Sequence, residues 1–298
     1  MLTMLIPFPT RRFPWMMSFR SFHTLPSNSA PLPGLLSHPS KASAHTTAAS
    51  AETAVLTSVA EPLMPRRRTD EPWRLAALVG PDIGADLRTV AEFNSQYGSG
   101  QRPRAVVDAI ETKGVLADQI EALLAAPSPG MERFVELPIA SDPTAWLVEL
   151  ARRQVKAKVR TGGVTGDAIP PSADIVRFLA AASRVNIPFK ATAGLHHALR
   201  GSHPLTYKPD SPRVVMHGFL NLLMTATLLR TGASETEAES LLDEDDPEAF
   251  QFGPVSVRWR NRRLSNEQIH DAREQFALSF GSCSFQEPVD ELRALRLL

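Results

Sequence analysis

Three of the six lysines in the chain fall in two short apolar runs that have the composition of strands. Lys156 and Lys158 lie in the first run and Lys190 lies in the second. Burial and a neighbouring cation both lower the pKa of a lysine, and the neutral amine can then attack a carbonyl carbon to form a Schiff base. The residues therefore indicate carbonyl chemistry through a lysine imine.

Side chains alternate between the two faces of a strand. Lys158 and Arg160 then share one face of the first run, and Lys190 and Thr192 share the corresponding face of the second. In a barrel this face points to the interior, while the small apolar residues of the other face pack against helices. We expect Lys158 and Lys190 to meet in one cavity.

Two carboxylates in the preceding strands are candidates for the same site. Glu136 and Asp108 face inward by the same alternation, and they are placed to move protons or to pair with the lysines. Arg160 has the planar guanidinium that holds anionic substrate groups. The alternative for all these residues is a structural network of ion pairs.

Several residues near predicted strand ends suggest substrate contacts. His196 and His217 suit acid–base chemistry or loop hydrogen bonding, and together with Glu136 they form an alternative set of ligands for a divalent metal ion. Ser282 lies in a Gly-Ser turn whose amides suit an anion. Cys283 has no identifiable base, so we expect it to be inert.

These residues depend on strands that alternate with helices. From residue 73 onward, short β-favouring runs alternate with amphipathic segments, as expected for βα units. The pattern predicts a (β/α)8 TIM-like barrel, complete or incomplete, with an open parallel sheet as the alternative. The predicted strands are residues 104–110, 133–139, 156–161, 188–193 and 213–217, and the further candidates are 252–259, 280–285 and 73–79, the last equally compatible with a helix. The predicted helices are residues 117–125, 145–154, 173–184, 218–230, 235–242 and 267–278.

The two lysine-containing runs resemble the motifs of class I aldolases of the deoxyribose-phosphate aldolase type. Lys158-Val-Arg-Thr-Gly162 is similar to the family's Lys-Thr-Ser-Thr-Gly, and Phe189-Lys-Ala-Thr-Ala-Gly194 is similar to its Phe-Lys-Pro-Ala-Gly-Gly. The resemblance spans residues 108–194. It implies that Lys158 is the nucleophile, that Lys190 lowers its pKa, and that Asp108 or Glu136 assists proton transfer, with no metal or other cofactor.

The chain also departs from that family. Arg160 replaces a small polar residue, and Leu195-His196-His197 replaces the second glycine and its phosphate-binding turn. Strings such as Lys-Ala-Thr-Ala-Gly-Leu-His-His and Phe-Gly-Ser-Cys-Ser-Phe are similar to those of a group of bacterial and plant proteins.

Composition limits the classes of partner. The 32 basic and 32 acidic residues give no net charge, which argues against a nucleic-acid partner. The longest apolar run is too short to cross a bilayer, and the single cysteine indicates a reducing compartment. We expect a cytoplasmic location. Residues 1–70 are rich in Pro, Ser and Ala and are predicted to form a disordered tail, either a mere extension or an organellar targeting segment.

Residues 71–298 are thus predicted to form a single α/β barrel domain. Its expected function is that of a carbon–carbon lyase acting through a lysine imine on a small anionic aldehyde or keto metabolite. The alternatives are a metal-dependent hydrolase or isomerase and a non-catalytic barrel that binds an anionic metabolite. A homo-oligomer is left open.

Overall fold

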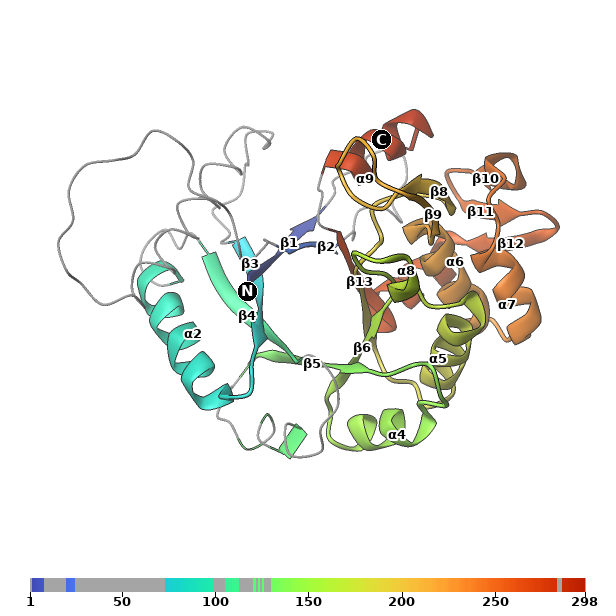
Figure 1. Ribbon diagram of the computed structural model, residues 1–298. Coiled ribbons are helices and arrows are strands. Elements are labelled where there is room, and N and C mark those ends of the chain that lie inside the picture. Colours follow the sequence, from blue (N-terminus) through green and yellow to red (C-terminus); the bar gives the residue numbers. More distant parts are fainter. Residues whose placement is uncertain are drawn as a thin grey trace.

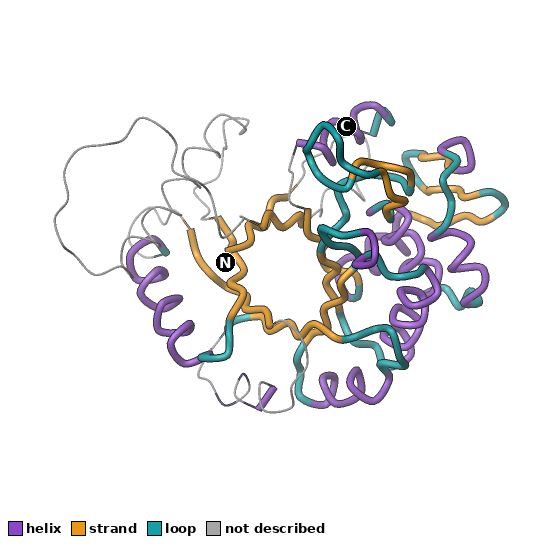
Figure 2. Tube along the Cα trace, in the orientation of Figure 1, coloured by secondary structure: helices purple, strands orange, loops and turns teal. Residues whose placement is uncertain are grey.

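The computed structural model describes residues 2–7, 20–24, 73–98, 105–112, 120–121, 123, 125, 130–282 and 286–297. Six parallel strands form a strongly curved sheet, with helices on its outer side (Figures 1 and 2). In their order across the sheet, the strands are β3 (Trp73–Val79), β4 (Ala105–Thr112), β5 (Glu132–Leu137), β6 (Lys156–Arg160), β7 (Phe189–Thr192) and β13 (Ala277–Ser282). The predicted α/β class and parallel sheet are confirmed, although six parallel strands are not eight βα units.

A hairpin from the start of the chain closes the ring. Strand β1 (Leu2–Pro7) is antiparallel to β3 and to β2 (Arg20–Thr24), and β2 is parallel to β13. Both strands lie in the segment that we predicted to be a disordered tail, so that prediction does not hold for them. The rest of residues 1–70 lies outside the described residues.

Two of the candidate barrel strands belong to small separate sheets. The segment predicted at 213–217 is β9 (Arg213–Met216), which pairs with β8 (Gly201–Pro204). The segment predicted at 252–259 is divided between β10 (Phe250–Phe252) and β11 (Ser256–Trp259), which form an antiparallel sheet with β12 (Arg262–Ser265). Connections of only a few residues join antiparallel strands, whereas parallel neighbours need a long crossover.

The helices lie outside the ring of strands (Figure 1). They are α2 (Ile83–Tyr97), α4 (Thr144–Arg152), α5 (Ser172–Arg184), α6 (Phe219–Arg230), α7 (Glu235–Leu242), α8 (Asn266–Gln275) and α9 (Gln286–Ala294). Helix α6 is buried on almost every side because it packs against α5, α7, α8 and β13. This explains why it is apolar all round. None of the helices in the described part of the chain is long and apolar enough to span a membrane.

The hydrophobic core has two parts, one on each face of the sheet. The large outer part joins strand residues such as Val159 and Ala191 to the helices. The inner part is small, and Ala76, Ala109 and Phe134 are its buried members. The lysines lie on the same inner face of the sheet, together with the carboxylates that they contact.

Candidate active site

Lys158 and Lys190 lie directly opposite each other on neighbouring strands. The register of β5, β6 and β7 places Glu136 beside Lys158 and Lys158 beside Lys190. Residues at matched positions of adjacent strands project from the same face. The structure therefore brings these three predicted site residues together inside the barrel, where the Nζ atom of Lys158 lies 3.1 Å from Oε2 of Glu136.

A carboxylate that we did not predict joins the two lysines. Oε2 of Glu111 lies 3.0 Å from Nζ of Lys158, and Oε1 of Glu111 accepts a short hydrogen bond from Nζ of Lys190. The exposed fractions of the side chains are 4% for Glu111, 5% for Lys158 and 1% for Lys190. One buried carboxylate thus bridges two buried amines.

Glu111 faces inward because β4 contains a bulge. Leu75 of β3 pairs with Val107, but the next residue, Ala76, pairs with Ala109, so Asp108 is the extra residue in β4. Such an insertion shifts the alternation of side chains by one position. An unbroken alternation from Asp108 would have turned Glu111 outward.

Asp108 itself does not contact the lysines. It forms an ion pair with Arg74 on the neighbouring strand. A second pair joins Lys156 to Glu132, with the Nζ atom 2.8 Å from Oε1. The role predicted for Asp108 as the carboxylate that serves the lysines therefore finds no support in its contacts, and Glu111 occupies that place.

The electrostatic environment differs among the members of the cluster. Burial lowers the pKa of Lys190 from 10.5 to about 8, and the positive charge of Lys158 acts in the same direction, while Glu111 opposes both. Burial alone would raise the pKa of Glu111, but the two lysines outweigh it and the pKa lies below its usual value. Lys190 is therefore an amine that loses its proton at about pH 8, well below the usual range of lysine.

Arg160 lies at the more open end of the cluster. Its side chain is 42% exposed, and its Nε atom lies 3.2 Å from Oε1 of Glu136. Counting Arg160, the cluster holds three basic groups and two carboxylates, so it is electrically balanced when one lysine is neutral. The charge count thus agrees with the lowered pKa of Lys190.

Two hydroxyl groups line the same interior face. Thr192 lies opposite Arg160, and Ser279 lies opposite Lys190. The hydroxyl oxygens of Thr192 and Ser279 are buried, and neither has a hydrogen-bond partner among the described residues. Buried polar atoms are rarely left without a partner, so both oxygens are suited to contact a bound molecule or ordered water.

The ends of β6 and β7 are held together by backbone contact. A Cβ atom on Gly162 would lie 2.8 Å from the Cα atom of Gly194, so neither position has room for a side chain. Ala193 and Gly194 have positive φ angles of 66° and 75°, and the hydroxyl of Thr161 donates to the carbonyl of Ala193 at 2.6 Å. Strained backbone of this kind often accompanies functional sites.

No protein-family model matches the chain, and neither the curated proteins nor the solved structures gave a match. The resemblance to deoxyribose-phosphate aldolases stays a prediction based on the motif residues. The geometry adds that the two motif lysines are opposite neighbours that share one carboxylate.

Two of the predicted substrate contacts meet each other. The Nδ1 atom of His196 lies 3.0 Å from the hydroxyl of Ser282 and 3.7 Å from a carboxylate oxygen of Glu287 on α9. The hydroxyl of Tyr207 donates to the same carboxylate at 3.0 Å. Cys283 lies outside the described residues.

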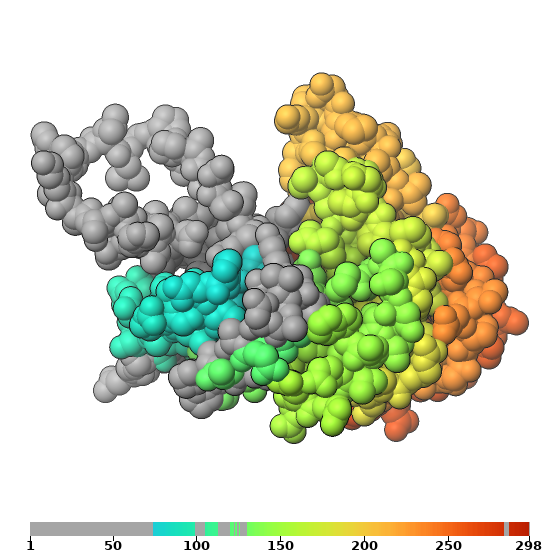
Figure 3. Space-filling model, turned by 60° about the horizontal axis from the view of Figure 1, so that its bottom comes forward, coloured from blue at the N-terminus to red at the C-terminus, as the bar shows by residue number. Residues whose placement is uncertain are grey.

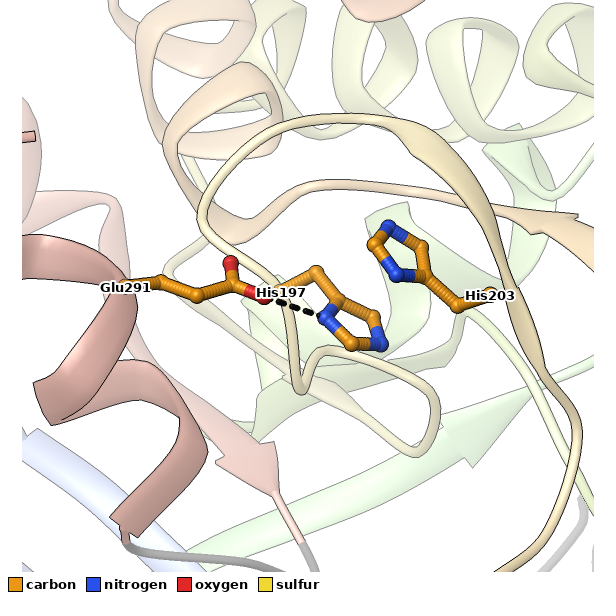
Figure 4. Close-up of side chains that lie close together, drawn as sticks. All are labelled: His197, His203 and Glu291. Carbon is orange, nitrogen blue, oxygen red and sulfur yellow. Dashed lines mark hydrogen bonds and ion pairs between the residues drawn. The ribbon is translucent and has the colours of Figure 1, made fainter. Parts of the chain in front are cut away.

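His217 lies apart from these residues. It is buried, its Nε2 atom bonds the carbonyl of Pro170 at 2.9 Å, and burial lowers its pKa. His196, His217 and Glu136 therefore do not form the alternative metal site, because each of the three contacts different residues. A different group, His197, His203 and Glu291, does come together (Figure 4). The two histidines are close in the sequence, but Glu291 lies 94 residues after His197, so local spacing could not reveal the whole group.

Proposed function

We propose that the protein is a carbon–carbon lyase, or a related carbonyl enzyme, that forms a Schiff base between Lys158 and a small anionic aldehyde or keto substrate. The observation that carries the proposal is the pair of buried amines bridged by Glu111. Burying three charges is costly unless they are well paired or used. Burial, opposed by the pairing with Glu111, leaves Lys190 with a pKa of about 8, so that an amine able to take up a proton lies beside the proposed nucleophile.

Lys158 is better placed than Lys190 to be the nucleophile. Lys158 retains a little exposure and lies between two carboxylates, whereas Lys190 is enclosed and bound to Glu111. A proton that leaves Lys158 has a path through Glu111 to the neutral amine of Lys190. Lys190 is thus proposed to accept the proton that Lys158 loses, and this loss makes Lys158 a nucleophile.

The proposed reaction begins when the neutral amine of Lys158 attacks the carbonyl carbon of the substrate. The carbonyl oxygen is protonated and leaves as water, which gives a protonated imine. The electron pair of the breaking carbon–carbon bond moves into the imine to form an enamine, and the hydroxyl proton of the departing aldehyde goes to a base. Protonation of the enamine carbon and hydrolysis by water then restore the amine. Glu136, at 3.1 Å from Nζ of Lys158, is the nearest candidate to move these protons besides Glu111.

The surrounding groups fit a small anion. The exposed guanidinium of Arg160 is suited to a carboxylate or phosphate, and the hydroxyls of Thr192 and Ser279 are suited to the oxygens of the substrate. We infer that the six parallel strands and the N-terminal hairpin work as a TIM-like barrel with this site at its mouth. A reducing compartment such as the cytoplasm suits a chain with one cysteine.

Borohydride trapping tests the proposal. The full chain is incubated with short aldehydes and 2-keto acids in the presence of borohydride, and adducts are measured by intact mass and located by peptide mapping. We expect an adduct on Lys158 that is absent in Lys158→Arg and much reduced in Lys190→Met. The control is Lys208→Arg, because Lys208 is an exposed lysine of the β8–β9 hairpin. Absence of any Lys158 adduct with the whole panel contradicts the proposal.

One observation favours a second candidate, a barrel that binds an anionic metabolite without turnover. Both lysines already have carboxylate partners, as a structural ion network would require. In that case the compounds of the panel would bind without an adduct, and Arg160→Gln would weaken binding. Calorimetry measures the binding of each compound of the panel without borohydride, and comparison with the adducts formed in its presence separates the two functions.

A further inference from the structure

Three potential metal ligands meet where the C-terminal helix contacts the segment that follows β7. His197 lies in that segment, His203 lies in β8, and Glu291 lies in α9 (Figure 4). One nitrogen of each histidine and one carboxylate oxygen of Glu291 all lie within 4.8 Å of one another. All three residues are partly buried.

His197 and Glu291 are held in place by each other and by neighbouring backbone groups. Nδ1 of His197 lies 2.5 Å from Oε1 of Glu291, and the N–H of Ala198 donates to Oε2 of the same carboxylate at 2.5 Å. The carbonyl of His197 accepts a hydrogen bond from the N–H of Phe219 at the start of α6. Contacts that orient a ligand in this way are a regular feature of metal sites.

His203 is held by stacking of its ring on His197. The imidazoles of His203 and His197 stack with their centroids 3.3 Å apart and their planes at 9°. A Cβ atom on Gly201 would lie only 2.8 Å from Nε2 of His203, so the absence of a side chain at Gly201 leaves room for the ring. Two imidazoles from separate segments therefore lie against each other beside one carboxylate.

We propose that His197, His203 and Glu291 bind a divalent transition-metal ion, and that Zn²⁺ fits the donor set best. Two imidazole nitrogens and one carboxylate oxygen are common zinc ligands, and ligand atoms in a tetrahedral site lie about 3.4 Å apart when the bonds are about 2.1 Å. The ligand atoms lie within 4.8 Å of one another, and binding would require the two stacked imidazoles to turn so that the ion lies in the plane of each ring. The contact between Nδ1 of His197 and Oε1 of Glu291 would give way to contacts with the ion.

Such an ion would tie α9 to the β8–β9 hairpin, which projects from the described surface as the golden lobe in Figure 3. Three protein ligands leave a fourth coordination position for water or a small ligand. Glu291 retains about a third of its side-chain exposure, so this position is accessible to solvent. The site is separate from the lysine cluster, and imine trapping does not depend on it.

The test is zinc binding by the full chain. Protein stripped by a chelator is titrated with Zn²⁺ against a chromophoric competitor, and Co²⁺ is added separately to record the visible absorption of a bound ion. We expect one tight equivalent that weakens at least 100-fold in His203→Ala and in Glu291→Gln. The control is His270→Ala, because His270 is an exposed histidine on α8 and is expected to leave binding unchanged.

A loss of zinc binding counts for the proposal when the variant is shown to be folded. The metal-free variants should keep the circular dichroism spectrum of the wild type, and His203→Gln replaces His203→Ala if the latter does not fold. Tight binding that persists in both ligand variants would place the ion elsewhere, for example at His23, His38 or His45, and would overturn the proposal. Binding no tighter than millimolar by the unaltered chain would overturn it equally.

Discussion

Glu111 is the residue on which the buried cluster depends. It is the carboxylate that contacts both Lys158 and Lys190, and it is almost completely buried. A charge removed from such a site leaves its partners buried without compensation, which costs far more than the loss of an exposed pair. Stability measurements on matched substitutions can therefore separate this contact from an ordinary ion pair.

We predict that Glu111→Gln lowers the free energy of unfolding by about 3 kcal/mol or more, because both buried lysines lose the charge of the carboxylate that bridges them. The matched control is Glu235→Gln, which breaks the exposed pair with Arg184 and should cost less than about 1 kcal/mol. Urea unfolding of the three proteins measures both values. Equal costs for the two substitutions would show that the bridge contributes no special stability.

The lowered pKa of Lys190 predicts a dependence of stability on pH. The folded protein gives up this proton at about pH 8, whereas the unfolded chain keeps it up to about pH 10.5. Between these values the unfolded state binds more protons, so the free energy of unfolding contributed by Lys190 rises with pH, by up to about 1.4 kcal/mol per unit. Below pH 8 the contribution is constant and at its lowest.

The measurement is the difference in unfolding free energy between the wild type and Lys190→Met at pH 7, 8, 9 and 10. Groups that titrate alike in both proteins cancel in this difference. We expect it to change little from pH 7 to 8 and then to rise in favour of the wild type. A difference that stays flat to pH 10 would mean that Lys190 keeps an ordinary pKa.

At the scale of elements, the junction of β6 and β7 is set by two glycines. Gly162→Ala would place a Cβ atom 2.8 Å from the Cα atom of Gly194, where only backbone can yield. We predict a loss of about 2 kcal/mol, because overpacking against the backbone is destabilising by about 1–3 kcal/mol. The control is Gly80→Ala, whose nearest neighbour is a side-chain oxygen at 3.5 Å. Thermal unfolding that moves both variants equally would contradict a close contact between the strand ends.

The strands that carry the site were predictable from the sequence, but the direction of the side chains in β4 was not. Runs such as β6 and β7 are short, apolar and bounded by Gly or Pro, so local composition locates them and alternation places Lys158 and Lys190 on one face. The bulge at Asp108 depends on pairing with β3, which no local pattern contains. A strand with carboxylates three positions apart therefore allowed two assignments, and we predicted Asp108, whereas Glu111 is the carboxylate that contacts both lysines.

Contacts between distant segments limited the prediction elsewhere. The pair formed by His196 and Ser282 joins predicted residues, but neither spacing nor periodicity indicated that they would meet. The same holds for Glu291, which reaches His197 from the last helix. The segments that form β9, β10 and β11 were taken for barrel strands because composition does not distinguish a strand of a barrel from a strand of a small sheet.

At the scale of the whole molecule, the closure of the ring by β1 and β2 differs most from the prediction, because the composition of residues 1–70 indicated a disordered tail. Strands β1 and β2 occupy the gap between β3 and β13, so the six parallel strands have no open edge in the structure. An open edge exposes backbone groups that promote association with other chains. The hairpin is thus expected to protect the sheet that carries the lysines.

Deletion of residues 1–24 should therefore destabilise the folded protein. We predict a loss of about 3 kcal/mol or more, equivalent to several degrees in the melting temperature, because the edges of β3 and β13 lose their partners. Association between chains should rise at the same time, and light scattering with size-exclusion chromatography measures it. The matched control deletes residues 26–49, which removes the same number of residues but keeps both strands. It should change stability little, because it leaves the pairing of β1 and β2 with β3 and β13 in place. If the two deletions behave alike, residues 1–24 are a dispensable extension and the parallel sheet is stable without the hairpin.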